Sequence, residues 1–121
     1  FITRNNAGLA IPLGSSATVG ELSLPPGAYA LDFAAHTYLA SAGATWVDCR
    51  LDADGTQLNK TAVLVGPDAP ATIESVISMT EASTFSSAVR VRVLCSERAE
   101  TNVQMTDVRL RAVRVGTVTV Q

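Results

Sequence analysis

Apolar and polar residues alternate along most of this chain with a period of two. The clearest case follows a turn at Pro25-Pro26-Gly27, where the prolines fix the backbone and the glycine allows a tight bend. The apolar row after this turn consists of Tyr29, Leu31, Phe33 and Ala35; the intervening row contains Ala30, Asp32 and His36. Such a strand buries one face and exposes the other. We expect it to reach about Leu39 and to be the central strand of a two-layered structure.

The same alternation predicts further strands, which cover residues 17–24, 45–51, 56–65, 84–95 and about 107–115, and a strand of mixed apolar phase is expected at 72–80. Gly20 interrupts the first of these and predicts a bulge, and Asp54-Gly55 predicts a tight hairpin turn. Val113 and Val115 change the apolar phase of the last strand, which predicts a second bulge or a change of sheet there. No stretch of ten or more residues has capped helical periodicity. The pattern predicts an all-β, antiparallel β-sandwich of jelly-roll or other Greek-key topology.

A chain of 121 residues has the length of one domain. Residues 1–16 are polar and weakly patterned, so we expect an N-terminal arm with at most an edge strand, followed by a sandwich domain over residues 17–121. A loop is expected at Gly66-Pro67-Asp68-Ala69-Pro70, because its two prolines lack backbone donors, and an extended tail at 116–121. The chain starts at Phe rather than Met, so we expect a processed piece with any targeting segment upstream.

Two cysteines, Cys49 and Cys95, stand in phase with apolar neighbours on strand-like segments, so both side chains should point inward. We expect a disulfide, which would indicate an oxidising setting outside the cell or in an assembled particle. The alternative is two reduced core cysteines that act as small hydrophobes. An immunoglobulin fold also pairs two cysteines, but here Trp46 precedes the first cysteine instead of standing between the two, and no tyrosine lies two residues before Cys95. It ranks second.

The composition of the chain argues against two classes of partner, nucleic acid and the membrane interior. Hydrophobic residues make up 47% of the chain and charged residues 17%, as in ordered globular proteins, and the net charge is −2. This charge gives no reason to expect nucleic acid as a partner. No apolar run approaches the roughly 20 residues that span a bilayer, so we expect no membrane insertion.

Groups able to perform chemistry are sparse. His36 is the only histidine, and Asp32, four residues away on the same strand, would lie about 13 Å from it. No Gly-x-Ser-x-Gly motif occurs, and cysteine and histidine are too few for a structural zinc site. Asp52-Ala53-Asp54-Gly55 is similar to the start of a calcium loop, but no glutamate follows at the required place, and a hairpin turn explains it. We therefore expect no enzyme activity, no metal and no cofactor.

Arginine is over-represented, with eight arginines against one lysine. The candidate interface or ligand residues are Arg90, Arg92, Arg109 and Arg111, which line polar faces of two strands, together with Trp46 and Tyr38. Three interpretations remain open for the arginines. They could pair with acids of the same chain, such as Asp32, Asp48 and Asp107, or remain solvated; they could meet Glu97 or Glu100 of a neighbouring subunit; or they could bind an anionic glycan.

The order of segments resembles the jelly roll of tumour necrosis factor and complement globular heads. The resemblance rests on Pro26-Gly27-Ala28-Tyr29 before a long strand, the Asp-Gly hairpin, the valine-rich strand and the closing Arg109-Leu110-Arg111-Ala112-Val113, and covers about residues 17–116. Bacterial surface modules and phage tail or capsid modules with such folds are similar too. The resemblance implies a ten-strand sandwich that usually trimerises through one sheet, as the head of a fibre, spike or coat.

We therefore expect a non-enzymatic module that self-associates, with a trimer favoured, in a virion or a secreted surface assembly. A cell-surface or glycan partner would be reached by its outer loops. The alternative is a carbohydrate-binding, lectin-like domain, with Trp46 and Tyr38 as stacking platforms and the arginines for acidic sugars.

Overall fold

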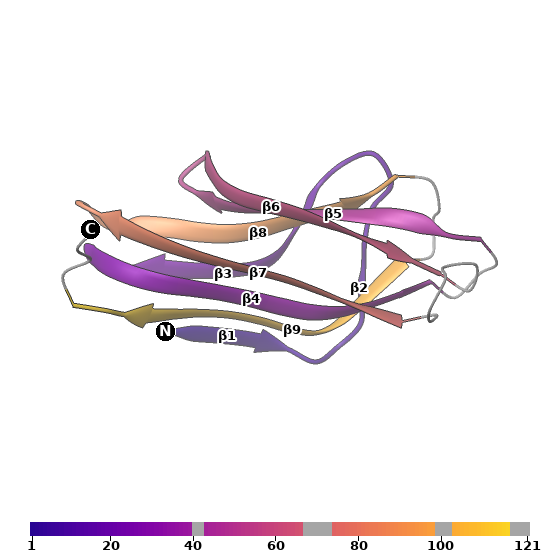
Figure 1. Ribbon diagram of the computed structural model, residues 1–121, viewed down its shortest axis with the longest axis horizontal. Helices are drawn as coiled ribbons and strands as arrows, with labels where there is room; N and C mark the ends of the chain where they lie inside the picture. Colours follow the sequence, from indigo (N-terminus) through magenta and orange to yellow (C-terminus); the bar gives the residue numbers. More distant parts are fainter. Residues whose placement is uncertain (40–42, 67–73, 99–102, 117–121) are drawn as a thin grey trace.

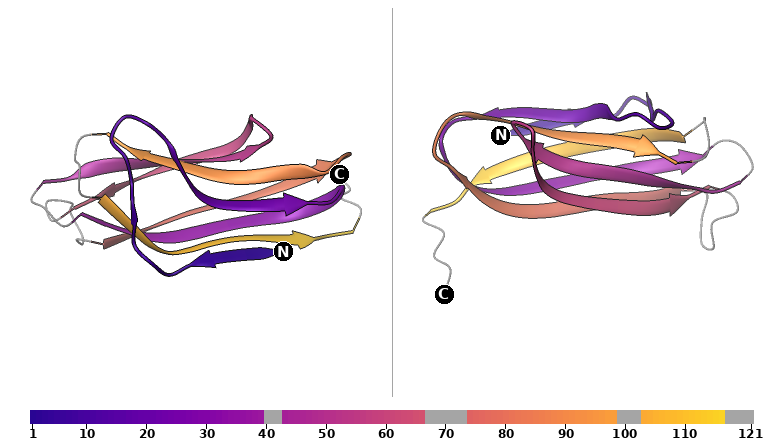
Figure 2. Two further views of the ribbon diagram at one scale, coloured as in Figure 1. Left: turned by 180° about the vertical axis from the view of Figure 1, so that it is seen from behind. Right: turned by 90° about the horizontal axis from the view of Figure 1, so that it is seen from above.

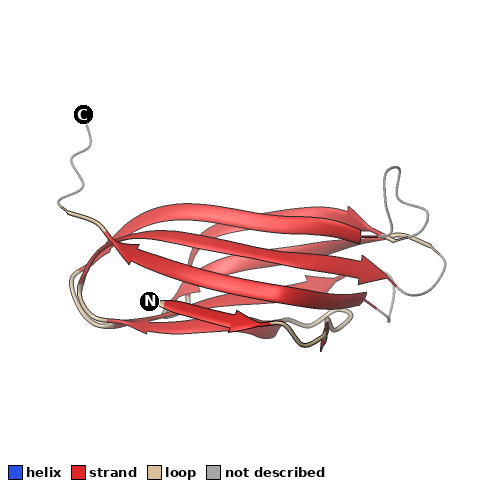
Figure 3. Cartoon of the chain, turned by 90° about the horizontal axis from the view of Figure 1, so that it is seen from below, coloured by secondary structure: helices blue, strands red, loops and turns tan. Residues whose placement is uncertain are grey.

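The computed structural model describes residues 1–39, 43–66, 74–98 and 103–116, and their regular structure is entirely β. Two antiparallel sheets pack against each other, which confirms the predicted β-sandwich (Figure 1). The strands are β1 (Ile2–Asn5), β2 (Leu9–Ala10), β3 (Ala17–Leu24), β4 (Gly27–Leu39), β5 (Thr45–Ala53), β6 (Thr56–Val65), β7 (Glu74–Phe85), β8 (Val89–Glu97) and β9 (Val103–Arg114). They run along the long axis, so the loops gather at its two ends (Figure 3).

Each sheet combines strands that are distant in the sequence. The first sheet has the order β1-β9-β4-β7, with the short β2 also pairing with β9, and the second has the order β3-β8-β5-β6. From β3 to β9, every connection except the β5–β6 hairpin passes from one sheet to the other (Figure 2). The first strand, β1, pairs with the last, β9.

β4 is the central strand that the alternation predicted. It pairs with β9 on one side and β7 on the other. The apolar row from Tyr29 to Ala35 is at most 1% exposed, whereas Ala30 and His36 face solvent. The core lies between this row and the inner faces of β5 and β8.

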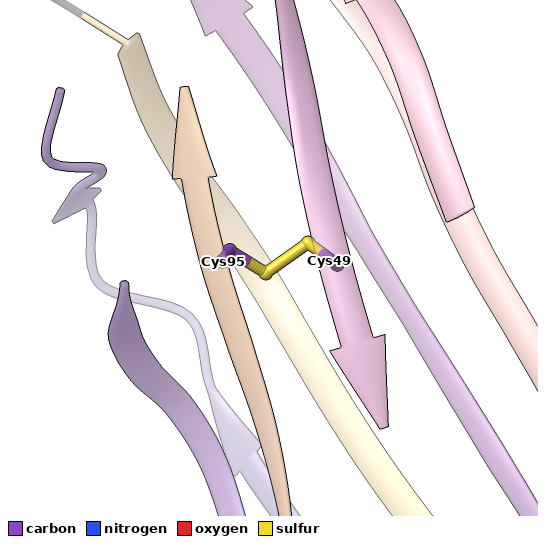
Figure 4. The surroundings of a disulfide bond; sticks show 2 residues. All are labelled: Cys49 and Cys95. Carbon is purple, nitrogen blue, oxygen red and sulfur yellow. A yellow bond between two sulfur atoms is a disulfide. The ribbon is translucent and has the colours of Figure 1, made fainter. Parts of the chain in front are cut away.

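Cys49 and Cys95 form a disulfide, as predicted (Figure 4). The two residues are directly opposite each other on the neighbouring strands β5 and β8, with Cα atoms 4.2 Å apart. The bond thus lies within the second sheet and does not join the two layers. A disulfide buried in a core indicates a non-reducing environment.

Two local predictions are confirmed. The β5–β6 hairpin turns at Asp54 and Gly55, which have φ angles of 48° and 92°, and the Gly55 N–H donates to Asp52 Oδ1 at 2.8 Å. Asp and Gly suit this turn because both of its positions require a positive φ, which these two residues tolerate. On β3 the register shifts between Thr18 and Gly20, at the predicted bulge.

Two boundaries were predicted wrongly. The strand expected at 84–95 is divided, because β7 continues to Phe85 and β8 begins only at Val89. The reason is the length of β4, whose 13 residues pair with β7 as far as Gly27 opposite Phe85.

The bulge expected at Val113 and Val115 lies instead at Asp107, where the register with β4 shifts and φ is 52°. Met105 and Val108 are both buried on either side of it. The inward phase of β9 therefore changes at Asp107, and Val113 simply faces outward.

Residues 1–16 contribute to the sandwich. β1 and β2 pair with β9, and Ile11 is 2% exposed within the core. The expected loop residues 67–70, the tail at 117–121 and Glu100 lie outside the described residues. Within the described ranges, no helix has the length and apolar character needed to cross a membrane.

Candidate functional site

The two arginine pairs singled out in the sequence lie on opposite sides of the molecule. Arg90 and Arg92 are on β8, in the second sheet, and Arg109 and Arg111 are on β9, in the first. Both pairs have the outward phase of their strands. The four side chains therefore cannot form one binding patch.

On the first sheet, both arginines approach one carboxylate. Arg111 Nη2 lies 2.9 Å from Asp32 Oδ2, and Arg109 Nη2 lies 3.7 Å from the same oxygen. Asp32 is placed there by the β4–β9 register, which sets it opposite Arg111. Because these groups are substantially exposed, solvent weakens their attraction.

On the second sheet, the predicted arginines also meet acids of the same chain. Arg90 Nε lies 2.9 Å from Glu21 Oε1 on β3, and Arg92 Nη2 lies 4.0 Å from Asp52 Oδ1. Each of the four arginines thus lies near an acid of the same chain. That any of them also contacts a ligand or a partner subunit stays a prediction.

The two predicted stacking residues are separated in the same way. Tyr38 lies on β4 in the first sheet, and Trp46 lies on β5 in the second, where it is 44% exposed. They stand on different faces, so they cannot form one aromatic platform for a sugar.

His36 lies on the outer face of β4, beside a depression of about 320 Å³ that also borders Arg4, Arg109 and Asp107. Within the described part of the chain, no group of three or more His, Cys, Asp or Glu side chains could hold a metal ion.

A second depression, which the sequence did not indicate, lies on the outer face of the second sheet. Its volume is about 380 Å³, and Arg50, Lys60 and Arg98 line it together with Asp48. Arg98 donates to both carboxylate oxygens of Asp48, from Nε at 2.7 Å and from Nη2 at 2.6 Å. Its guanidinium carbon also lies 5.7 Å from the centre of the Trp46 ring. Arg50 and Lys60 are opposite each other across the β5–β6 hairpin, whereas Arg98 lies 50 positions from its partner Asp48, and the local pattern does not predict that contact.

The hydrogen bonds from Arg98 hold the pKa of the Asp48 carboxyl below its ordinary value, and the positive charges of Arg98 and Lys60 act in the same direction. Burial opposes this shift. The pKa of Arg98 is raised by the same hydrogen bonds. The pair is therefore fully charged at neutral pH.

The outer faces of the two sheets differ in chemistry. On the first sheet, small side chains occupy the centre, among them Ala30, Ala34, Ser78, Thr80 and Ala82. Exposed large apolar side chains lie around them: Ile2, Val76 and Val113. Phe1 is also exposed, but it has the inward phase of its partner Ala112, and its ring packs edge-on against Tyr29. The charged residues Arg4, Asp32, Arg109 and Arg111 lie on the outer face of the first sheet too. The outer face of the second sheet carries the exposed Trp46 and a set of charged residues: Glu21, Asp48, Arg50, Lys60, Arg90 and Arg92.

Comparison with known proteins places the fold but no family. No family model matches the chain, and no curated protein is similar to it in sequence. Among solved structures, the chain is similar to part of dimeric latent PorU from Porphyromonas gingivalis, with a TM-score of 0.58 and 10% identity over 92% of this chain. It is also similar to part of the insecticidal delta-endotoxin Cry8Ea1 from Bacillus thuringiensis, with a TM-score of 0.52 and 15% identity over 88% of this chain.

The matched regions make up 12% of the PorU chain and 20% of the endotoxin chain. At these identities the likeness concerns the sandwich fold alone.

Proposed function

We propose that this chain is a non-enzymatic structural module that self-associates through the outer face of its first sheet. The small and apolar side chains on that face carry this proposal. The first sheet exposes Ile2, Val76 and Val113 near alanine, serine and threonine side chains, whose small size allows another backbone to approach closely. Exposed apolar side chains that share a sheet face are typical of interaction surfaces.

Charges on the same face are compatible with a second copy. Arg4, Arg109 and Arg111 provide positive charge, and Asp32 and Asp107 provide negative charge. A surface that carries both signs can be complementary to itself in a symmetric assembly. The trimeric state of the proposal comes from the resemblance to tumour-necrosis-factor and complement heads.

The strand order supports a jelly roll. When the two-residue β2 is left out and the other eight strands are counted in chain order, the first sheet contains the first, eighth, third and sixth strands. The second sheet contains the second, seventh, fourth and fifth, and this is the strand order of an eight-strand jelly roll. The disulfide supports a location outside reducing compartments. We therefore propose a head or coat domain of a virion, as in a tail, spike or capsid decoration, or of a secreted surface assembly.

Light scattering coupled to size exclusion tests the proposal. The wild-type chain should have three times its monomer mass of 12.6 kDa. Ala30 is exposed on β4, so Ala30→Arg should place a bulky cation in the contact and produce monomers. The matched control is Ala62→Arg, at an exposed position on β6 of the other sheet, which should leave the mass unchanged.

Circular dichroism would show that both variants remain folded. A wild-type monomer at all concentrations would contradict self-association. If Ala62→Arg dissociated the assembly and Ala30→Arg did not, the contact would lie on the second sheet, and the proposed surface would be wrong.

A further inference from the structure

The depression on the outer face of the second sheet has the composition of an anion-binding site. Its volume of about 380 Å³ lies within the range of roughly 300–1,000 Å³ that is usual for small-molecule sites. Three cationic side chains, Arg50, Lys60 and Arg98, line it, with Asp48 as its one carboxylate. This local excess of two positive charges stands in a chain whose net charge is −2.

The two central cations lack an acid of their own. Arg50 on β5 and Lys60 on β6 are directly opposite each other in the register, an arrangement of like charges that disfavours the sheet. Neither forms an ion pair within the described part of the chain. The nearest carboxylates on the same strand are engaged elsewhere, because Asp48 accepts from Arg98 and Asp52 accepts from the Gly55 N–H.

The remaining lining provides neutral hydrogen-bonding groups. Gln57 contributes an amide, and Ser16, Thr61 and Ser96 contribute hydroxyls. Trp46 is exposed next to the site, because its ring lies against the guanidinium of Arg98. Cations beside neutral donors and an aromatic ring match a sugar that carries a negatively charged group, since its hydroxyls and its apolar ring face would both find partners.

We propose that this depression binds a saccharide that carries an oxyanion, either the carboxylate of a uronic acid or a sulfate ester. Arg50 and Lys60 contact the anionic group, and Arg98 supports it from the rim while it remains paired with Asp48. The site does not depend on self-association through the first sheet, because it lies on the opposite face and stays accessible in such an assembly.

Asp48 gives the proposal a specific signature. Its carboxylate is the negative charge nearest the site, and it occupies the guanidinium of Arg98. Asp48→Asn should therefore tighten anion binding, by about fivefold. Arg50→Gln and Lys60→Gln should each weaken binding, by about tenfold.

Calorimetric titration of the full chain tests the site with five probes: an oligogalacturonate, a sulfated oligosaccharide of the same length, the matching neutral oligosaccharide, inorganic sulfate and an acidic peptide. We expect one or both acidic saccharides to bind, more weakly as ionic strength rises. Whichever of the two acidic saccharides binds more tightly shows whether the site prefers a carboxylate or a sulfate. Arg90→Gln is the matched control, because it removes one arginine from the same face outside the depression and should leave affinity unchanged.

Several results would overturn the proposal. These are equal binding of the neutral oligosaccharide, failure of both acidic saccharides to bind, equal losses in Arg90→Gln and Arg50→Gln, or inorganic sulfate as tight as the saccharides. Binding of an acidic peptide with the same affinity as the saccharides would also overturn it, in favour of a protein partner.

Discussion

Arg98 shows how one backbone contact positions a side chain for several roles. Its N–H donates to the Trp46 carbonyl at 3.1 Å, which brings the start of its side chain beside β5. From there the guanidinium reaches both oxygens of Asp48 and lies against the Trp46 ring. The planar, forked guanidinium can do both at once, whereas a lysine at this position would lose the bidentate geometry.

The Asp48 pair predicts a defined response to acid. The pKa of Asp48 is lowered below 3.8 in the folded chain, so its carboxylate stabilises the fold at every pH above that value. This stabilisation is lost as the pH falls through the lowered pKa. NMR titration of the Asp48 carboxyl carbon should give a midpoint below 3.8.

In Arg98→Gln the midpoint should rise towards the ordinary value, because the main cause of the shift is removed. An unchanged midpoint in that variant would show that Arg98 does not set the pKa.

At the scale of the elements, close approach of backbone segments fixes the ends of the strands. Gly66 follows β6 with a φ of 131°, and it is buried. A Cβ atom there would collide with the Gly43 carbonyl and would lie 2.8 Å from Leu39 Cδ2. Only glycine therefore allows the end of β6 to pack against the end of β4 and the two residues that precede β5.

Gly66→Ala should consequently lower the free energy of unfolding by about 3 kcal/mol, from crowding and backbone strain together. Gly14→Ala is the control, because Gly14 also has a positive φ, 76°, but nothing lies within 4 Å of its would-be Cβ. That variant should lose only about 1–2 kcal/mol. Chemical denaturation measures both, and equal losses would argue against crowding at Gly66.

The elements also show what the sequence can and cannot predict. Alternation placed the inner row of β4 correctly because its pattern depends only on the pleat of one strand. The end of β7 and the bulge at Asp107 were misplaced because both depend on pairing with β4, a partner that local pattern does not reveal.

At the scale of the whole molecule, the disulfide connects positions 46 residues apart in the chain. A cross-link of this span limits the unfolded chain, and its loss should lower the free energy of unfolding by about 4 kcal/mol in the chain-entropy account. Cys49→Ala combined with Cys95→Ala tests this by denaturation against the oxidised wild type. If the two proteins unfold at the same denaturant concentration, the disulfide does not stabilise the fold.

The candidate site illustrates the same limit for the molecule as a whole. The sequence alone predicted that Arg90, Arg92, Arg109 and Arg111 lie on polar strand faces. It did not predict to which sheet each pair belongs. The depression at Arg50 exists only because the β5–β6 hairpin lies beside β8, a strand that is distant along the chain. Side-chain types and spacing carry no information about such a meeting.

The pairing of the first strand with the last has a consequence for biosynthesis. β1 leaves the ribosome before β3 to β8, yet its partner β9 follows all of them. β4 likewise waits for both of its neighbours. Such non-local pairing makes folding slow and leaves strand edges exposed to aggregation in the nascent chain. Chaperone protection during translation should therefore matter more for this protein than for a helical bundle of equal length.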